Sequence, residues 1–242
     1  MLFALIAVAA SQTVRTLPAD IPTLNLVADH ASVTLRTVPG ATETVVTATP
    51  VRWSEGCMLD FTGSSEEANV TVVVPETFGA HCKTEIDVAM AGYTKVTTDI
   101  GRGAVRLEDL AANADIALGG GRVSGTTRAN FTRIELQRGR VVLKELAVPV
   151  DVDVAVGSVL LEFDEAIAGT VASRVGLGRN RVRFPYGVWL DKEVDTVVGR
   201  TFTAIPTRTS SDTHLVARAG LGSVRVETVL TDELGDSVAD SD

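Results

Sequence analysis

Residues 134–143 read IELQRGRVVL, and residues 152–161, which follow 18 positions later, read VDVAVGSVLL. In both stretches apolar and polar residues alternate, a glycine stands sixth, and a valine and a leucine follow the glycine two and four positions later. Such alternation places every second side chain on one face of a strand, so each stretch predicts two half-buried strand segments. The glycine predicts a turn or kink between them, because glycine adopts positive φ at little steric cost.

The same unit returns through the second half of the chain at spacings of 18, 18, 18, 21, 21 and 23 residues. Its glycines are Gly103, Gly121, Gly139, Gly157, Gly178, Gly199 and Gly222. This period fits one β-turn-β unit and is too short for two helices, although the units at Gly178 and Gly199 follow the pattern less well. Of the 242 residues 45% are hydrophobic and only 5% aromatic, and an aliphatic core of this kind favours β-structure.

We therefore predict an all-β chain that forms a right-handed parallel β-helix, or a related β-solenoid, of about seven repeats of 18–23 residues. An antiparallel β-sandwich is the alternative. In the solenoid, Val105, Val123, Val141 and Val159 are expected to form one internal ladder. Strands are also expected before the repeats, at residues 23–27, 32–38, 43–49, 69–74 and 84–88.

Four segments are expected along the chain. Residues 1–10 carry no charge and end in small residues, which is typical of a secretory signal peptide cleaved after Ala9 or Ala10; a misplaced start or a buried first strand is the alternative. Residues 20–90 form an N-terminal β region, and residues 91–230 form the repeats that continue it. Residues 231–242 carry acids and no base, which predicts a disordered acidic tail. No later stretch approaches the ~18 apolar residues of a transmembrane helix.

The two cysteines, Cys57 and Cys82, both lie in the N-terminal region. An even number of cysteines in an exported chain predicts a disulfide between them, and two free buried thiols are the alternative. A metal site built from both cysteines and His81 would lack a clear fourth ligand. We therefore expect no metal.

Composition and motifs exclude several classes of function. The net charge of −9 and the scarcity of aromatic residues disfavour a nucleic-acid binder. Sequences typical of a nucleophile elbow, a zinc protease or a phosphate loop do not occur, and the triple glycine 119–121 lies inside a strand repeat instead of opening a helix. We expect no catalytic residue and no cofactor, and we predict that the chain is not an enzyme.

Two groups of side chains are candidates for binding or catalysis. Arg122, Arg140, Arg179 and Arg200 each follow a repeat glycine directly, so coils stacked in register would align them about 4.8 Å apart per coil, in a column able to bind phosphate, sulfate or carboxylate groups. The alternative is that they only keep the edge soluble. Asp151 and Asp153 project from one strand face at a separation suited to an inverting glycosidase, and a solvated strand face is the alternative interpretation.

The cadence Ile134-x-Leu-x-x-Gly-x-Val-x-Leu143, repeated as Val152-x-Val-x-x-Gly-x-Val-x-Leu161 and in related form from Val96 to Leu107, resembles the bacterial "putative adhesin" family of β-strand-repeat domains. It is also similar to the head domains of autotransporter adhesins. The resemblance covers roughly residues 24–229 and implies a β-helical domain exposed on or near the bacterial envelope, without functional residues to carry over.

From these features we expect a non-enzymatic, exported, adhesin-like interaction or structural module of the cell envelope, in the periplasm or at the cell surface. Its expected partner is an envelope protein or an anionic polysaccharide. The alternatives are a carbohydrate-active β-helix enzyme, which the few aromatic residues disfavour, and an envelope-stress sensor or scaffold.

Overall fold

The computed structural model describes residues 12–18, 22–63, 67–73, 81–90 and 95–229. The predicted signal peptide, the predicted acidic tail and the expected start of the repeats at residue 91 lie outside these residues. The described part contains no helix, and so none that could span a membrane. Its strands are β1 (Thr13–Pro18), β2 (Thr23–Thr37), β3 (Glu43–Trp53), β4 (Met58–Gly63), β5 (Glu67–Val73), β6 (Cys82–Met90), β7 (Lys95–Leu110), β8 (Ala114–Thr127), β9 (Thr132–Leu146), β10 (Asp151–Phe163), β11 (Gly169–Pro185), β12 (Asp191–Thr203) and β13 (Thr213–Val229).

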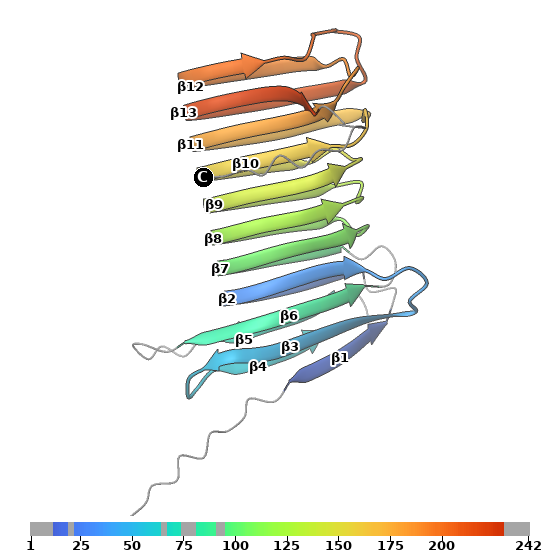
Figure 1. Ribbon diagram of the computed structural model, residues 1–242. Helices are drawn as coiled ribbons and strands as arrows, with labels where there is room; N and C mark the ends of the chain where they lie inside the picture. Colours follow the sequence, from blue (N-terminus) through green and yellow to red (C-terminus); the bar gives the residue numbers. More distant parts are fainter. Residues whose placement is uncertain (1–11, 19–21, 64–66, 74–80, 91–94, 230–242) are drawn as a thin grey trace, which may run out of the picture.

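All of these strands belong to one sheet, whose main order is β1-β3-β6-β2-β7-β8-β9-β10-β11-β13-β12 (Figure 1). Every pair from β2 and β7 up to β13 and β12 is parallel. Among the described strands, antiparallel pairing is confined to β1 with β3, β3 with β6 and β4 with β5. The predicted all-β class and the parallel stacking of the repeats are therefore confirmed, and the antiparallel sandwich is wrong for the repeats.

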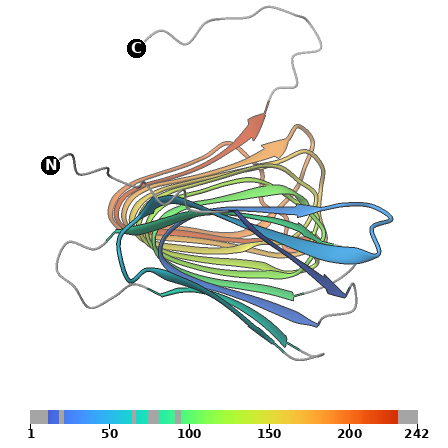
Figure 2. The same cartoon turned by 90° about the horizontal axis from the view of Figure 1, so that it is seen from below.

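Each repeat is a single long strand folded over at its glycine, so that the stack consists of bent coils (Figure 2). The bend glycines stand opposite one another from coil to coil. Gly139 shows why no other residue fits: its φ is +141°, and a Cβ there would lie 1.9 Å from the carbonyl oxygen of Gly121. Close approach of the two backbones and the positive φ both require glycine.

The interior of the stack is filled by side chains that alternate with the outward ones. Val105, Val123, Val141 and Val159 are opposite one another in neighbouring coils and are at most 2% exposed, so the predicted ladder is confirmed. Apolar residues before the bend, such as Ile134 and Leu136, are buried as well. Neither half of a coil could bury this surface alone, which is why stacking stabilises the fold.

The first coil is β2, one continuous strand where the sequence predicted two, at residues 23–27 and 32–38. It pairs in parallel with β7 along its length, and Ala31 occupies the place of the bend glycine opposite Gly103. On its other side β2 pairs with β5 up to Ala28 and with β6 from His30 onward. No single strand therefore passes the bend there, which explains why a residue with a Cβ is tolerated and why no glycine marked this coil.

The last two coils do not follow the order of the chain. β13 lies between β11 and β12, so β12 is the final strand of the stack (Figure 1). The unit around Gly199 looked out of phase in the sequence, yet Gly199 stands opposite Gly222 in the common register. Its apolar residues Val197 and Val198 are exposed.

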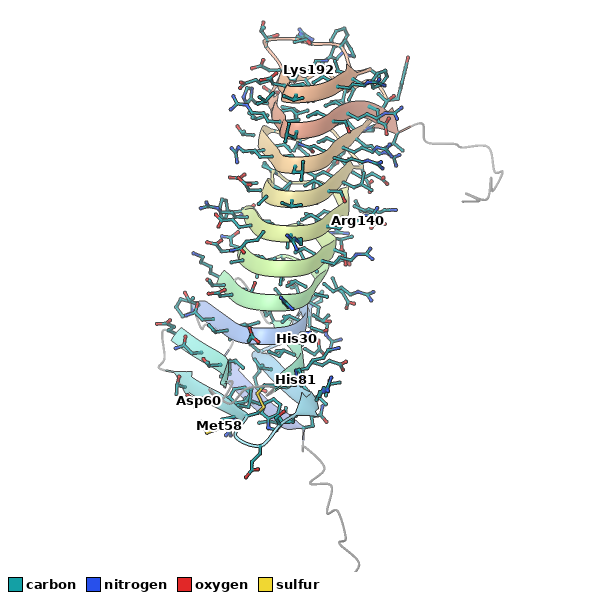
Figure 3. All side chains as sticks on the ribbon, turned by 90° about the vertical axis from the view of Figure 1, so that its left-hand side faces the viewer. His30, Met58, Asp60, His81, Arg140 and Lys192 are labelled. Carbon is teal, nitrogen blue, oxygen red and sulfur yellow. A yellow bond between two sulfur atoms is a disulfide. The ribbon has the colours of Figure 1, made fainter. Side chains whose placement is uncertain are left out.

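The opposite end of the stack holds the predicted disulfide. Cys57 and Cys82 are bonded, with their Cα atoms 5.7 Å apart, next to the antiparallel pair β3 and β6 (Figure 3). The indole Nε1 of Trp53 donates a hydrogen bond to the carbonyl oxygen of Cys57 at 3.1 Å. The bond uses both sulfurs, so the metal-site alternative with His81 is wrong.

Candidate functional site

The four predicted arginines lie in one outward-facing column, each directly after a bend glycine. The column reads, from coil to coil, Ala104, Arg122, Arg140, Ser158, Arg179, Ser223 and Arg200. Arg122 and Arg140 are therefore neighbours, whereas a serine separates Arg140 from Arg179. Insertion of β13 places a second serine between Arg179 and Arg200, which the order of the chain would have made neighbours.

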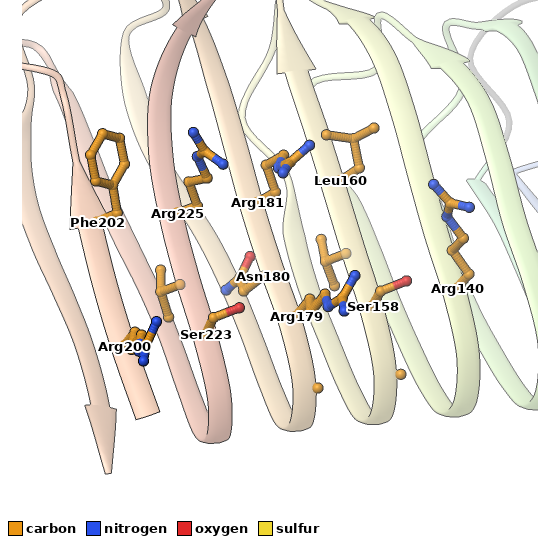
Figure 4. A pocket seen from close by; sticks show the side chains of 14 residues that line it. Arg140, Ser158, Leu160, Arg179, Asn180, Arg181, Arg200, Phe202, Ser223 and Arg225 are labelled. Carbon is orange, nitrogen blue, oxygen red and sulfur yellow. The ribbon is translucent and has the colours of Figure 1, made fainter. Parts of the chain in front are cut away.

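A basic hollow of about 840 Å³ opens over the outer face of the C-terminal coils (Figure 4). Three predicted arginines, Arg140, Arg179 and Arg200, line it, and Arg122 lies one coil outside. The lining also includes Arg181, Arg225, Ser158, Ser223 and Phe202. Arg181 and Arg225 were missed in the sequence, although both stand three residues after a bend glycine, at the next outward position of the strand.

Arg181 and Arg225 are held by a shared carboxylate, Glu227, whose side chain is only 15% exposed. Their Nε atoms lie 3.6 Å and 2.5 Å from its carboxylate oxygens. Arg225 also lies over the ring of Phe202, 5.0 Å from its centroid. Both guanidinium groups are thus already matched by protein groups.

Arg183 binds the same carboxylate, and Glu162 in addition, at 2.9 Å and 3.3 Å. Burial by itself would lower the pKa of Arg183. The hydrogen bonds to Glu227 and Glu162 outweigh this effect, so the pKa of Arg183 is raised above its ordinary value. This network holds the side chains of Arg181 and Arg225 in the wall of the hollow.

The arginines beside the bend glycines differ from the other arginines of the coils. Within β7 to β13 and their connections, ion pairs involve Arg106, Arg128, Arg133, Arg174, Arg181, Arg183, Arg218 and Arg225, none of which adjoins a bend glycine. The bend arginines, which form no ion pair with any residue in the described ranges, are Arg102, Arg122, Arg138, Arg140, Arg179 and Arg200.

The seven bends of β7 to β12 contain no carboxylate. Each bend comprises the residues from two before to one after its glycine, namely 101–104, 119–122, 137–140, 155–158, 176–179, 197–200 and 220–223, and none of these segments contains Asp or Glu. In a chain of net charge −9 this segregation produces one edge of positive potential. We call this line of bends, from β7 to β12, the bend edge.

The candidate carboxylate pair on β10 is divided between two environments. Asp151 accepts a hydrogen bond from Nη1 of Arg174 at 2.8 Å. Asp153 lines a hollow of about 600 Å³ together with Asp99 and Glu135, and Asp151 is not part of that lining. An arginine-paired aspartate beside a solvated one fits the outer face of a strand better than a glycosidase pair.

Two of the few aromatic residues lie together near the last coil. Tyr186 and Trp189 line a common hollow of about 680 Å³ with Arg208 and Asp212, beside the connections that flank β12. Trp53 lies at the other end of the stack, beside the disulfide. Within the described ranges, no group of three or more His, Cys, Asp or Glu is arranged to hold a metal ion.

Comparison with known proteins gives distant structural relatives alone. The chain matches no described protein family and no curated protein. A crystal structure of a "putative cell adhesion protein" from Clostridium sporogenes has 9% identity and a TM-score of 0.37, and the match covers 90% of this chain and 99% of that one. A "putative adhesin" from Bacteroides fragilis has 10% identity and a TM-score of 0.43, covering 89% and 97%. At these values the fold assignment rests on this chain's own strand pairing, and the family resemblance stays a prediction.

Proposed function

We propose that this chain is a non-enzymatic, exported, adhesin-like module of the cell envelope that binds an anionic component of the envelope through its bend arginines. The observation that carries the proposal is the contrast within strands β7 to β13: each arginine away from the bends has a carboxylate partner, whereas the six at the bends have none among the described residues. Unpaired guanidinium groups are free to form bidentate contacts with phosphate, sulfate or carboxylate groups.

A rigid stack allows several weak contacts to bind one ligand at the same time. One exposed ion pair contributes only about 0–1 kcal/mol. Arginines fixed at multiples of about 4.8 Å along one edge engage a repeating anion simultaneously, and each further contact is effectively intramolecular. Such binding weakens with salt, because exposed charges are screened within about 10 Å at 0.1 M.

The proposed compartment is supported by the disulfide between Cys57 and Cys82, since such bonds persist in oxidising surroundings. The signal peptide, the choice between periplasm and cell surface, and the right-handed sense of the coil belong to this proposal as well. The carbohydrate-active alternative is weakened by the pairing of Asp151 with Arg174.

The test is retention of the full chain on immobilised dextran sulfate, eluted with a salt gradient. The variant R122S/R140S/R179S/R200S places at each position the serine that Ser158 and Ser223 already supply in this column. We expect it to elute at clearly lower salt than the parent, with a nearly unchanged thermal midpoint, because these side chains are exposed.

The matched control removes four paired arginines instead, as R106S/R133S/R174S/R218S, and has the same net charge. This control should elute at a salt concentration closer to that of the parent. Equal elution of the two variants would show that retention follows total charge and that the bends are not a binding site. Elution of the bend variant together with the parent would refute the proposal directly.

A further inference from the structure

An apolar ridge runs along the C-terminal half of the bend edge. It is formed by the residue directly before each bend glycine: Val156, Leu177, Leu221 and Val198, which are 36%, 47%, 50% and 60% exposed. The four are opposite one another in successive coils, so their exposed surfaces are contiguous. Contiguous exposed apolar surface of this kind marks an interaction site.

The ridge is confined to β10, β11, β13 and β12. In the earlier coils the same column contains His30, Arg102, Gly120 and Arg138. The change from cationic to aliphatic residues occurs between Arg138 and Val156, while the fold of the coil stays the same. The bend therefore does not require an apolar residue here.

Cations accompany the ridge on the other side of the bend. Arg179 and Arg200 directly follow the glycines that Leu177 and Val198 precede, and Val197 adds a fifth exposed aliphatic side chain. The coils fold over at these glycines, and the folds form one convex margin of the stack (Figure 2). The exposed arginines and aliphatic residues that adjoin the glycines in the chain therefore belong to that margin. The partner must then be flat or concave, anionic at its surface and apolar beneath it.

We propose that the bend edge docks on a lipid bilayer that contains anionic lipids. This inference rests on the proposed function and names its anionic component: the arginines contact lipid phosphates, and the aliphatic ridge enters the boundary between headgroups and acyl chains. From β7 to β12 the edge is about 30 Å long at the usual strand spacing, which spans several headgroups.

Charge and polarity favour a bilayer over a second copy of this chain and over a soluble polysaccharide. A second copy docked through the same edge would bring unpaired arginines together without carboxylates to match them. A soluble polysaccharide would satisfy the arginines but offers no apolar layer for Leu177 and Leu221. A bilayer with anionic headgroups satisfies both sets of side chains.

The experiment is flotation of the full chain with vesicles of phosphatidylcholine alone or mixed with phosphatidylglycerol. We expect the parent to float with the mixed vesicles only. The variant L177S/L221S should lose at least tenfold in the vesicle-bound fraction and keep its retention on dextran sulfate. The control V27S/V51S alters two valines that are similarly exposed, 44% and 49%, on β2 and β3, and should float like the parent.

Four results would overturn the inference. If the parent is retained on dextran sulfate but floats with neither vesicle, the bilayer is wrong and the proposed function stands. If the ridge variant floats as well as the parent, the contact is purely electrostatic. If sedimentation shows a dimer that the ridge variant loses, the ridge belongs to a second copy of this chain. If the parent is neither retained on dextran sulfate nor floated by vesicles, the proposed function is refuted as well.

Discussion

β9 and β12 carry the same unit and show two different uses of it. Gly139 and Gly199 stand in one register of bend glycines, and Val141 and Thr201 stand in one inward column. Val141 is fully buried between two neighbouring coils, whereas Thr201 is exposed at the end of the stack. The comparison teaches that the repeat determines the shape of a coil, while its position in the stack determines whether the inward residues form a core.

The last coil is adapted to having a single neighbour. Lys192 occupies an inward position of β12, opposite Leu215, and its Nζ donates hydrogen bonds to Oγ1 of Thr203 at 2.7 Å and to the carbonyl oxygen of Ile205. Burial lowers the pKa of this ammonium group. Polar residues thus close the open end of the interior, as terminal repeats of solenoids require.

The largest expected effect in this comparison comes from the bend glycines. Gly139→Ala would place a Cβ 1.9 Å from the carbonyl oxygen of Gly121, in a coil fixed on both sides. We expect a loss on the order of 5 kcal/mol in the free energy of unfolding, or no folded protein, from the clash and the positive φ. Urea unfolding followed by circular dichroism measures it.

Gly199→Ala is the matched variant in the last coil, where the Cβ would lie 1.7 Å from the oxygen of Gly222. β12 has no partner beyond it among the described strands and can move outward. We therefore expect a loss of only about 2 kcal/mol. Equal losses at the two glycines would mean that the end of the stack is as constrained as its middle.

A charge introduced at an inward position should also affect the stability of β9 and β12 to different extents. Val141→Asp puts an unpaired carboxylate into the middle of the valine ladder, which should cost about 4 kcal/mol. Thr201→Asp, in the same column, and Arg140→Asp, on the outer face next to Val141, should each cost less than about 1 kcal/mol. Thermal and urea unfolding of the three variants measure the difference, and similar tolerance at Val141 and Arg140 would show that inward and outward faces are misassigned.

The disulfide concerns the other end of the stack, and its expected effect on stability is smaller than those of Gly139→Ala and Val141→Asp in the middle coils. Removing it by C57A/C82A opens a loop with a sequence separation of 25 residues, which should cost roughly 3.5 kcal/mol in the chain-entropy account. Urea unfolding of the variant and the parent measures it. A digest without reductant should contain the peptide joining both cysteines, and free thiols at both positions in exported protein would contradict the bond.

Much of the coil could be predicted from the sequence because its determinants are local. Alternation of period two sets the inward and outward faces, as at Val141 and Arg140, and the glycine marks the bend. The arginine column follows from the same reasoning, since every residue directly after a bend glycine faces outward. The cysteine pair needed only the count of cysteines and the expectation of export.

In β11, tertiary contacts compensate for a residue that departs from the repeat pattern. Asn180 occupies the valine column of β11 and is 1% exposed, which made this unit look degraded in the sequence. Its amide nitrogen donates to the carbonyl oxygens of Ser173 and Arg218, and the hydroxyl of Ser173 donates to its oxygen. A buried polar side chain is tolerated here because every polar atom has a partner.

By itself, the sequence determined the β class, the bent repeat, the faces of each strand and the outward arginines. Only the tertiary structure decided which coils are neighbours: that β2 is the first coil, that β13 separates β11 from β12, and that Val156, Leu177, Leu221 and Val198 form one ridge. The physical reason is that periodicity acts within a few residues, whereas any coil of this pattern offers its neighbour the same backbone hydrogen bonds and the same apolar face. Stacking order is therefore set by the connections and by which coil can end the stack, and the surfaces shared between coils follow from that order.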